Sequence, residues 1–177
     1  ASALTGGNLK IINIIPKIIK TEIDILKKVG ATIKIKGKEL RIIGKKKIKN
    51  IKLTTSPYPG FPTDMQAQLM VLLCKSFGRS EIIERIFENR FMHAPELNRM
   101  GAKINIIGNK AIINGNVNFK AAELMATDLR ASVSLILAAL SAKGKSIINR
   151  IYHLDRGYEK IEQKLQSVGA SIRRISE

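Results

Sequence analysis

The chain has 177 residues, of which 45% are hydrophobic, and a formal net charge of +17 from 31 basic and 14 acidic side chains. This length and hydrophobic content suit one globular domain with a core and exclude a disordered chain. There is no run of about 18 apolar residues, and the first residues lack the basic and then apolar form of a signal peptide, so we expect neither a membrane span nor a secretory leader.

The positive charge is concentrated in the first 53 residues, which hold 14 basic and 3 acidic side chains. Such an excess raises the possibility of nucleic-acid binding. Many of these lysines alternate with isoleucine, as in residues 33–36, and on a strand this pattern turns isoleucine inward and lysine toward solvent. Aromatic residues make up 5% of the chain and do not interleave with the lysines. We therefore favour a solvated lysine face and expect no nucleic-acid partner.

Cysteine and histidine are scarce. Cys74 is the one cysteine, so no internal disulfide can form, which fits a reducing cytoplasm. It falls within an apolar helix, where a buried thiol is favoured over a nucleophile. The two histidines, His93 and His153, have no zinc-binding spacing, so we expect no metal site.

A helix end, a glycine and an alternating strand recur three times along the chain. The glycines are Gly30, Gly101 and Gly169, spaced 71 and 68 residues apart. Each is expected to end its helix in the left-handed conformation, which glycine adopts without a steric penalty. The strand after the third glycine is expected to reach Ile175.

A second pattern recurs 64 residues apart, where Thr63-Asp64 and Thr127-Asp128 each open a long apolar helix. Both residue types suit a helix start because their side-chain oxygens accept the free N–H groups of the first turn. A glycine, a strand and a second helix follow. The apolar helices are expected over residues 69–77 and 133–142, and the strands over residues 82–87 and 147–152.

The repeated unit is therefore helix, strand, helix, strand, with room for a hairpin. The first unit has its hairpin turn at Gly37-Lys38-Glu39, and residues 108–118 supply the hairpin of the second. The third has none, and the first begins near the end of a helix. We predict one incomplete α/β domain, with units at about residues 1–55, 56–120 and 121–177, completed by native sequence outside this chain.

Four strings in the second and third units are long and ordered. They are FPTDMQAQ at 61–68, FENRFMH at 87–93 with PEL at 95–97, MATDLRAS at 125–132, and RIYH at 150–153 with DRGYE at 155–159. Together they resemble the UDP-N-acetylglucosamine 1-carboxyvinyltransferases, a family of enolpyruvyl transferases. The resemblance implies an inside-out α/β barrel domain of repeated units. It also implies a second, N-terminal domain that is absent from this chain.

The resemblance further implies the reaction. Members of this family move enolpyruvate from phosphoenolpyruvate to the 3-hydroxyl of UDP-N-acetylglucosamine and release phosphate, without a cofactor, during peptidoglycan precursor synthesis in the bacterial cytoplasm. The chemistry needs a base for the hydroxyl and cations for a carboxylate and a phosphate. Because the family's reactive cysteine lies in the other domain, we expect this chain to be inactive alone.

Two positions are implied to meet the sugar nucleotide. Asp64 matches the residue that contacts the sugar and takes its hydroxyl proton, although without the neighbouring motifs a plain helix N-cap would be the favoured interpretation. Ile86 matches a position that touches the sugar nucleotide, and it also fits a core strand residue.

Three arginines are implied to bind phosphoenolpyruvate and phosphate, since arginine forms two parallel hydrogen bonds to either group. They are Arg90, Arg130 and Arg156. The alternative for each is a surface ion pair with Glu88, Asp128 or Asp155. We expect Glu88 and Asp128 to orient arginines rather than react.

Two other functions stay open. The sister enzyme, 3-phosphoshikimate 1-carboxyvinyltransferase, shares the fold and chemistry, but the second and fourth strings speak against it. A non-catalytic remnant could bind polyanions through residues 10–53, in which case its DNA binding would weaken steeply with salt and ignore sequence.

Overall fold

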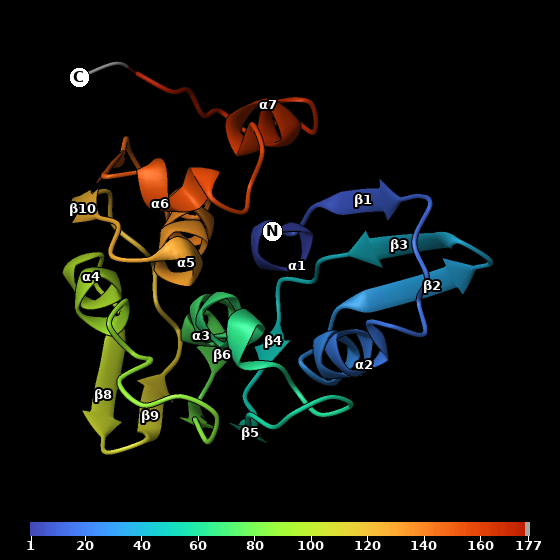
Figure 1. The fold of residues 1–177 in the computed structure, drawn as a ribbon, viewed down its shortest axis with the longest axis horizontal. Helices are drawn as coiled ribbons and strands as arrows, with labels where there is room; N and C mark the ends of the chain where they lie inside the picture. Colours follow the sequence, from blue (N-terminus) through green and yellow to red (C-terminus); the bar gives the residue numbers. More distant parts are fainter. Residues whose placement is uncertain (176–177) are drawn as a thin grey trace.

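The structure is a computed structural model that describes residues 1–175. It mixes helices and strands (Figure 1), as expected for an α/β protein. In chain order the elements are α1 (Ser2–Thr5), β1 (Asn8–Ile11), α2 (Lys20–Lys28), β2 (Thr32–Lys36), β3 (Glu39–Ile43), β4 (Ile48–Lys49), β5 (Lys52–Thr54), the 3-10 turn η1 (Thr63–Met65), α3 (Gln66–Cys74), β6 (Ser76–Phe77), β7 (Arg79–Ile83), α4 (Ala94–Arg99), β8 (Lys103–Ile107), β9 (Lys110–Asn114), β10 (Glu123–Met125), α5 (Leu129–Leu140), β11 (Ile147–Asn149), α6 (Tyr152–Asp155) and α7 (Ile161–Gln166).

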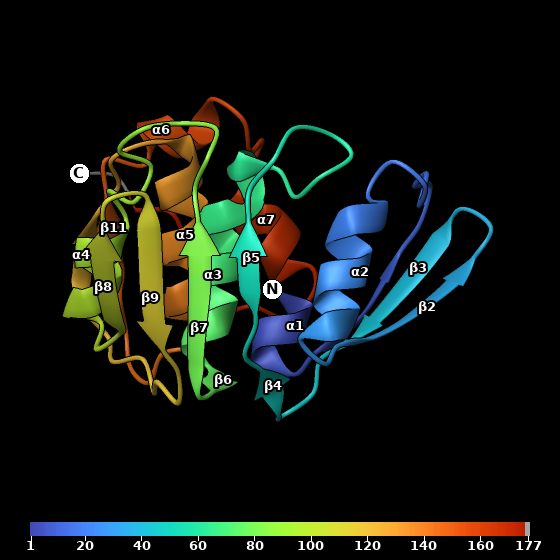
Figure 2. The same cartoon turned by 90° about the horizontal axis from the view of Figure 1, so that it is seen from below.

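The strands form four separate sheets in the described part of the chain, and none of these sheets closes on itself. The largest has the order β5-β7-β9-β8, and a three-stranded sheet has the order β1-β3-β2. Figure 2 shows the four-stranded sheet with α3 and α5 behind it, and the three-stranded sheet beside α2. The pairs β10-β11 and β4-β6 are short and parallel. The α/β class is therefore confirmed, whereas a barrel is not seen.

The two larger sheets repeat the same pairing. In the first, β1 pairs with β3 through Asn8↔Ile43, and in the second, β7 pairs with β9 through Arg79↔Asn114. Both residue numbers of the second pair are 71 higher than those of the first, and 71 is also the spacing between Gly30 and Gly101. The hairpins β2-β3 and β8-β9 keep the same offset. The sequence repeat thus corresponds to a repeat of strand pairing.

The glycines that punctuate the repeat have the expected backbone. Gly30, Gly101 and Gly169 follow helices with φ of 112°, 93° and 96°. A side chain with a Cβ rarely adopts this region, so glycine at these points releases the chain from each helix into the next segment. The hairpin turns at Gly37 and Gly108 also have positive φ, at 58° and 55°.

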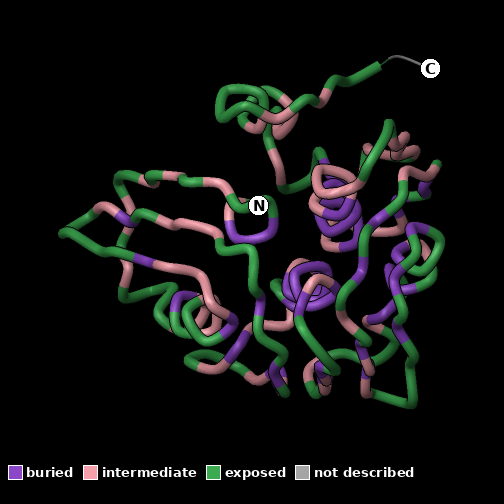
Figure 3. Tube along the Cα trace, turned by 180° about the vertical axis from the view of Figure 1, so that it is seen from behind, coloured by how far each residue is buried: buried purple, intermediate pink, exposed green. Residues whose placement is uncertain are grey.

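The main core surrounds α3 and α5, which pack against each other. Eight of the nine residues of α3 are buried, so this helix is apolar on every side. In Figure 3 the coils of α3 and α5 are among the most continuously buried parts of the tube. A smaller cluster of Ile23, Ile33 and Leu40 joins α2 to its sheet.

Several predicted boundaries were wrong. The strand expected over residues 82–87 is β7, which ends at Ile83, because the side chain of Glu84 takes the N–H groups of Ile86 and Phe87. The strand expected over residues 147–152 ends at Asn149, where Arg150 turns the chain with a φ of 59°.

Other differences have a tertiary cause. The helix expected over residues 69–77 ends at Cys74, because Ser76–Phe77 pair with β4. The helix expected over residues 133–142 is α5 (Leu129–Leu140), which begins earlier because Asp128 caps it. The third-unit strand is not formed, since residues 170–175 have no strand partner in the described part of the chain. Ile35 is 45% exposed, because it lies near the hairpin tip beyond the cover of α2.

Replacing Gly115 with alanine should destabilise the fold by about 1–3 kcal/mol, the usual range for overpacking. A Cβ atom at this position would overlap the carbonyl oxygen of Ser76 and lie 2.8 Å from that of Gly78. Urea denaturation measures the effect. Gly7→Ala is the control, because a Cβ there meets its nearest neighbour at 3.4 Å. Equal midpoints for the two variants would contradict the prediction.

Candidate active site

Asp64 meets two arginines from distant parts of the sequence. Its Oδ1 accepts a hydrogen bond from Arg90 Nη2 at 2.8 Å and another from Arg130 Nε at 2.7 Å. The Asp64 side chain is 58% exposed, whereas that of Arg90 is 20% exposed. Three of the residues implied by the sequence are therefore brought together at one surface.

The structure separates the roles of the two matching aspartates. Asp128 is the N-cap of α5, and its Oδ1 accepts the N–H groups of Arg130 at 2.7 Å and Ala131 at 3.0 Å. Asp64 makes no such cap, since η1 begins after Pro62 without a side-chain capping bond. Asp64 is thus free to face the arginines, while Asp128 holds the first turn of the helix that carries Arg130.

Arg90 lies in the segment between β7 and α4. Its guanidinium carbon is 4.7 Å from the centre of the Phe87 ring, a cation–π arrangement that restricts where the arginine can point. Its Nε is buried and has no hydrogen-bond partner among residues 1–175. Beside it lies a hollow of about 460 Å³ that is lined by Glu84, Phe87, Glu88, Asn89, Arg90, Phe91, Met92, Pro95, Ile106, Gly108 and Asn109.

The arginines keep Asp64 ionised. The hydrogen bond from Arg130 is the largest cause of a lowered pKa at Asp64, and the charges of both arginines act in the same direction, against partial burial. The hydrogen bond to Asp64 in turn raises the pKa of Arg130. Because the pKa is lower in the folded state, this pairing stabilises the fold at neutral pH and is lost as the pH falls through that pKa. With Asp64 so exposed, the contribution is about 1 kcal/mol or less.

Arg156 is not part of this cluster. It follows α6 with an exposed side chain that makes no ion pair or hydrogen bond to any residue in the range 1–175. Asp155 does not bind it, since Asp155 pairs with Arg174 at 2.6 Å. The next residue, Gly157, does pack close to α5, where a Cβ would lie 3.0 Å from Leu129 Cδ2. Arg156 therefore lies on a loop that borders the start of α5.

Two further predicted residues are near the cluster without joining it. Ile86 is half-buried in the loop after β7, and its N–H binds Glu84 Oε1 at 2.8 Å. Glu88 lines the hollow beside Arg90 and is exposed, but its side chain orients no arginine among the described residues. Asp128 accepts the backbone N–H of Arg130 and no arginine side chain among residues 1–175, so the orienting roles of Glu88 and Asp128 stay predictions.

Glu84 was missed at the sequence level, where it counted as one residue of a strand. It is 2% exposed and accepts hydrogen bonds from the residues around it. The available signal was an acidic residue directly after the apolar pair Ile82-Ile83, at the point where a buried strand ends.

A family model described as EPSP synthase (3-phosphoshikimate 1-carboxyvinyltransferase) matches residues 1–165. The chain belongs to this family. It is 73% identical over 176 residues to the UDP-N-acetylglucosamine 1-carboxyvinyltransferase of Pelagibacter ubique (strain HTCC1062), and 52% identical over 176 residues to that of Desulfosudis oleivorans. Each alignment covers 99% of this chain and 42% of the relative. The chain thus spans less than half the length of these relatives.

Two solved structures have a similar fold. The enolpyruvyl transferase NikO from Streptomyces tendae has a TM-score of 0.81 and 30% identity, covering 88% of this chain and 36% of its own. An EPSP synthase from Acinetobacter baumannii has a TM-score of 0.73 and 16% identity, covering 99% of this chain and 41% of its own. The second likeness bears on the fold alone.

Cys74 and His93 both lie away from solvent. Burial raises the pKa of the Cys74 thiol to about 12, as suits the core cysteine predicted from the sequence. His93 is 2% exposed, and burial lowers its pKa to about 4, so it is neutral at physiological pH. In the described residues, no three His, Cys, Asp or Glu side chains gather as a metal site would need. No described helix is long and apolar enough to cross a membrane.

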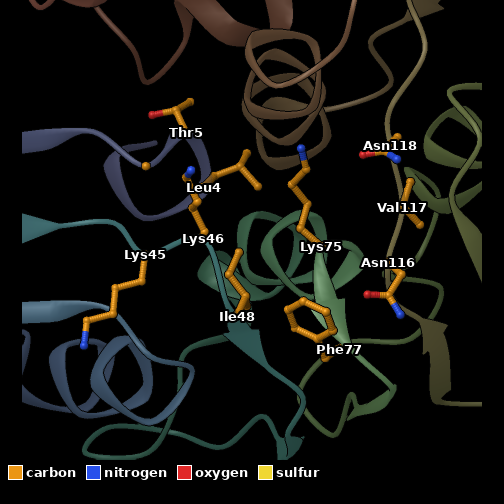
Figure 4. Close-up of a pocket in the computed structure, with 11 residues that line it drawn as sticks. Leu4, Thr5, Lys45, Lys46, Ile48, Lys75, Phe77, Asn116, Val117 and Asn118 are labelled. Carbon is orange, nitrogen blue, oxygen red and sulfur yellow. The ribbon is translucent and has the colours of Figure 1, made fainter.

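A second hollow, of about 420 Å³, lies at the other end of α3 from Asp64. Three lysines line it, Lys45, Lys46 and Lys75 (Figure 4). The figure shows Lys46 and Lys75 directed toward the same gap, whereas Lys45 points away from them. The lysines therefore do not converge as they would around one bound anion.

Proposed function

We propose that this chain is the part of a UDP-N-acetylglucosamine 1-carboxyvinyltransferase that supplies the catalytic base and two phosphate-binding arginines. The enzyme would move enolpyruvate from phosphoenolpyruvate to the 3-hydroxyl of UDP-N-acetylglucosamine and release phosphate, making a peptidoglycan precursor in the bacterial cytoplasm. The observation that carries the proposal is the meeting of Asp64 with Arg90 and Arg130. The name of the 73% identical relative supports the choice of sugar nucleotide.

Asp64 acts as the general base in this proposal. It takes the proton of the sugar 3-hydroxyl while that oxygen bonds to C2 of phosphoenolpyruvate, and C3 gains a proton to give a tetrahedral ketal. Loss of a C3 proton with departure of phosphate then restores the double bond. Arg90 and Arg130 hold the phosphate and carboxylate, because a guanidinium matches either group with two hydrogen bonds. Ile86 contacts the sugar nucleotide, and Arg156 completes the cationic lining.

The ion pairs with Asp64 suggest how the base becomes effective. A carboxylate whose pKa is lowered by two arginines is a weak base. When the anionic groups of phosphoenolpyruvate draw the arginines away, the pKa of Asp64 rises and its ability to accept a proton increases. Binding of the anionic substrate would thereby prepare the base for the second substrate.

The rest of the enzyme completes the architecture in this proposal. The chain forms part of an inside-out α/β barrel domain, with units at about residues 1–55, 56–120 and 121–177. An N-terminal domain outside this chain supplies the opposite wall of the cleft. The support is that the chain spans 42% of the relatives' length and that the pairing of β1 with β3 recurs once, 71 residues later, between β7 and β9.

Phosphate release from phosphoenolpyruvate tests the proposal. The chain is assayed alone and together with the remaining N-terminal part of the Pelagibacter ubique relative. We expect release only in the mixture, and only with UDP-N-acetylglucosamine. Release with shikimate 3-phosphate in its place would favour the sister enzyme instead. A folded mixture that is inactive with both acceptors would contradict the proposal.

A further inference from the structure

The carboxylate of Glu84 is buried and holds several hydrogen bonds. Its Oε1 accepts from Thr55 Oγ1 at 2.8 Å, from Ile86 N at 2.8 Å and from Phe87 N at 3.3 Å. Its Oε2 accepts from Thr63 Oγ1 at 2.9 Å. With 2% of the residue exposed and no ion pair to it among residues 1–175, these neutral donors alone satisfy the buried carboxyl oxygens.

These bonds join two segments that are separate in sequence. Thr63 directly precedes Asp64 in η1, while Ile86 and Phe87 lead to Arg90. Thr63 lies 21 positions before Glu84, whereas Ile86 and Phe87 lie two and three positions after it. The same carboxylate therefore bonds to the segment that carries Asp64 and to the segment that carries Arg90.

The main chain fixes Glu84 itself. Its N–H donates to the Asn109 carbonyl at 2.8 Å, and Asn109 Nδ2 donates to its carbonyl at 3.0 Å. Thr55 adds a second link, because its Oγ1 accepts the N–H of Arg85 at 3.0 Å. The carboxylate thus has little freedom to move, and it holds the two segments to the end of β7, an interior strand of the sheet.

We propose that Glu84 is a positioning residue for the reaction, which sets the placement of the Asp64 segment relative to the Ile86–Arg90 segment. This role rests on the proposed function. Glu84 acts through Thr63 and through the backbone of Ile86 and Phe87. Its loss lets the base and the substrate-binding segment move independently, and a misplacement of about 1 Å can cost about 100-fold in rate.

Two substitutions at Glu84 distinguish the effect of losing its hydrogen-bond acceptors from the effect of changing its volume. Glu84→Met keeps a side chain of similar length and removes both carboxyl oxygens, leaving only a weakly accepting thioether sulfur. Glu84→Gln keeps one oxygen for the N–H groups, and its NH2 can donate to Thr63 Oγ1, since a hydroxyl also accepts. Glu81→Met is the matched control, because Glu81 lies three residues earlier, on β7, and pairs with the exposed Lys52 rather than with either segment of the site.

The experiment measures kcat and both KM values in the mixture of this chain with the remaining part of the enzyme, and hydrogen exchange of the chain. We expect Glu84→Met to lower kcat by about 10- to 100-fold and to speed exchange in residues 55–65 and 84–90, while the hairpin at 103–114 stays protected. Glu84→Gln should recover most of kcat, and Glu81→Met should match the parent.

Unchanged kcat and exchange in Glu84→Met would overturn the inference. So would faster exchange in the hairpin as well, because that result marks a general loss of structure. If the parent mixture has no activity, the proposed function fails. The hydrogen exchange of the Glu84→Met chain then still tests whether Glu84 links the two segments. Faster exchange confined to both segments then supports the link between them, and unchanged exchange overturns it.

Discussion

Replacing Asp64 with asparagine should reduce turnover of the complete enzyme by about 10²- to 10⁴-fold, the range expected for loss of a general base. The same substitution should tighten the binding of sulfate to this chain by about two- to fivefold, because Arg90 and Arg130 no longer have to leave a carboxylate. An isosteric amide keeps the volume and removes only the charge. Isothermal titration of sulfate measures the second effect without any need for activity.

The same competition predicts in which direction sulfate affinity changes with pH. As the pH falls through the lowered pKa of Asp64, the carboxyl is protonated and the arginines are released, so sulfate should bind the parent chain more tightly. The Asp64→Asn chain should lack this part of the pH dependence. Asp155→Asn is the control, since Asp155 has its own arginine, Arg174, outside the cluster. Equal sulfate affinity of the parent and the Asp64→Asn chain near neutral pH would contradict the competition.

Replacing Leu73 with alanine should destabilise the chain by about 2–5 kcal/mol. Leu73 is fully buried in α3, where atoms surround it on every side, so the substitution leaves a cavity that the two packed helices cannot close. Urea denaturation followed by circular dichroism should show a lower midpoint. Ile12→Ala is the matched control, because Ile12 is 57% exposed, and its effect should stay within about 0.5 kcal/mol. Similar midpoints for both variants would mean that α3 is not the centre of the core.

Parts of the fold follow local rules and could be predicted. The hairpin turn at Gly37 and the helix ends at Gly30 and Gly101 depend on a backbone region that glycine enters freely, so a few neighbouring residues suffice. The apolar helices were also found, although their ends were misplaced by several residues. The predicted end of a strand was wrong where a side chain accepts the backbone N–H groups that a neighbouring strand would otherwise bind, as Glu84 does for Ile86.

In the candidate site, too, local sequence predicts some features and tertiary contacts decide others. Thr63-Asp64 and Thr127-Asp128 are alike in sequence, yet Asp128 caps α5 while Asp64 binds arginines. The difference comes from what surrounds each aspartate, because Arg130 lies 66 residues beyond Asp64 in the chain. The catalytic roles of Asp64, Arg90, Arg130 and Arg156 stay predictions.

The sequence by itself determined the α/β class, the repeat of about 71 residues and the resemblance to the enolpyruvyl transferases, because each depends on short-range patterns or on long ordered strings. Only the tertiary structure decided that Arg90 and Arg130 share one carboxylate, that Arg156 stands apart from them, and that Glu84 links two segments of the site. These contacts join residues that the chain brings together through the packing of α3 against the sheet and of α5 against α3. No local pattern records that packing.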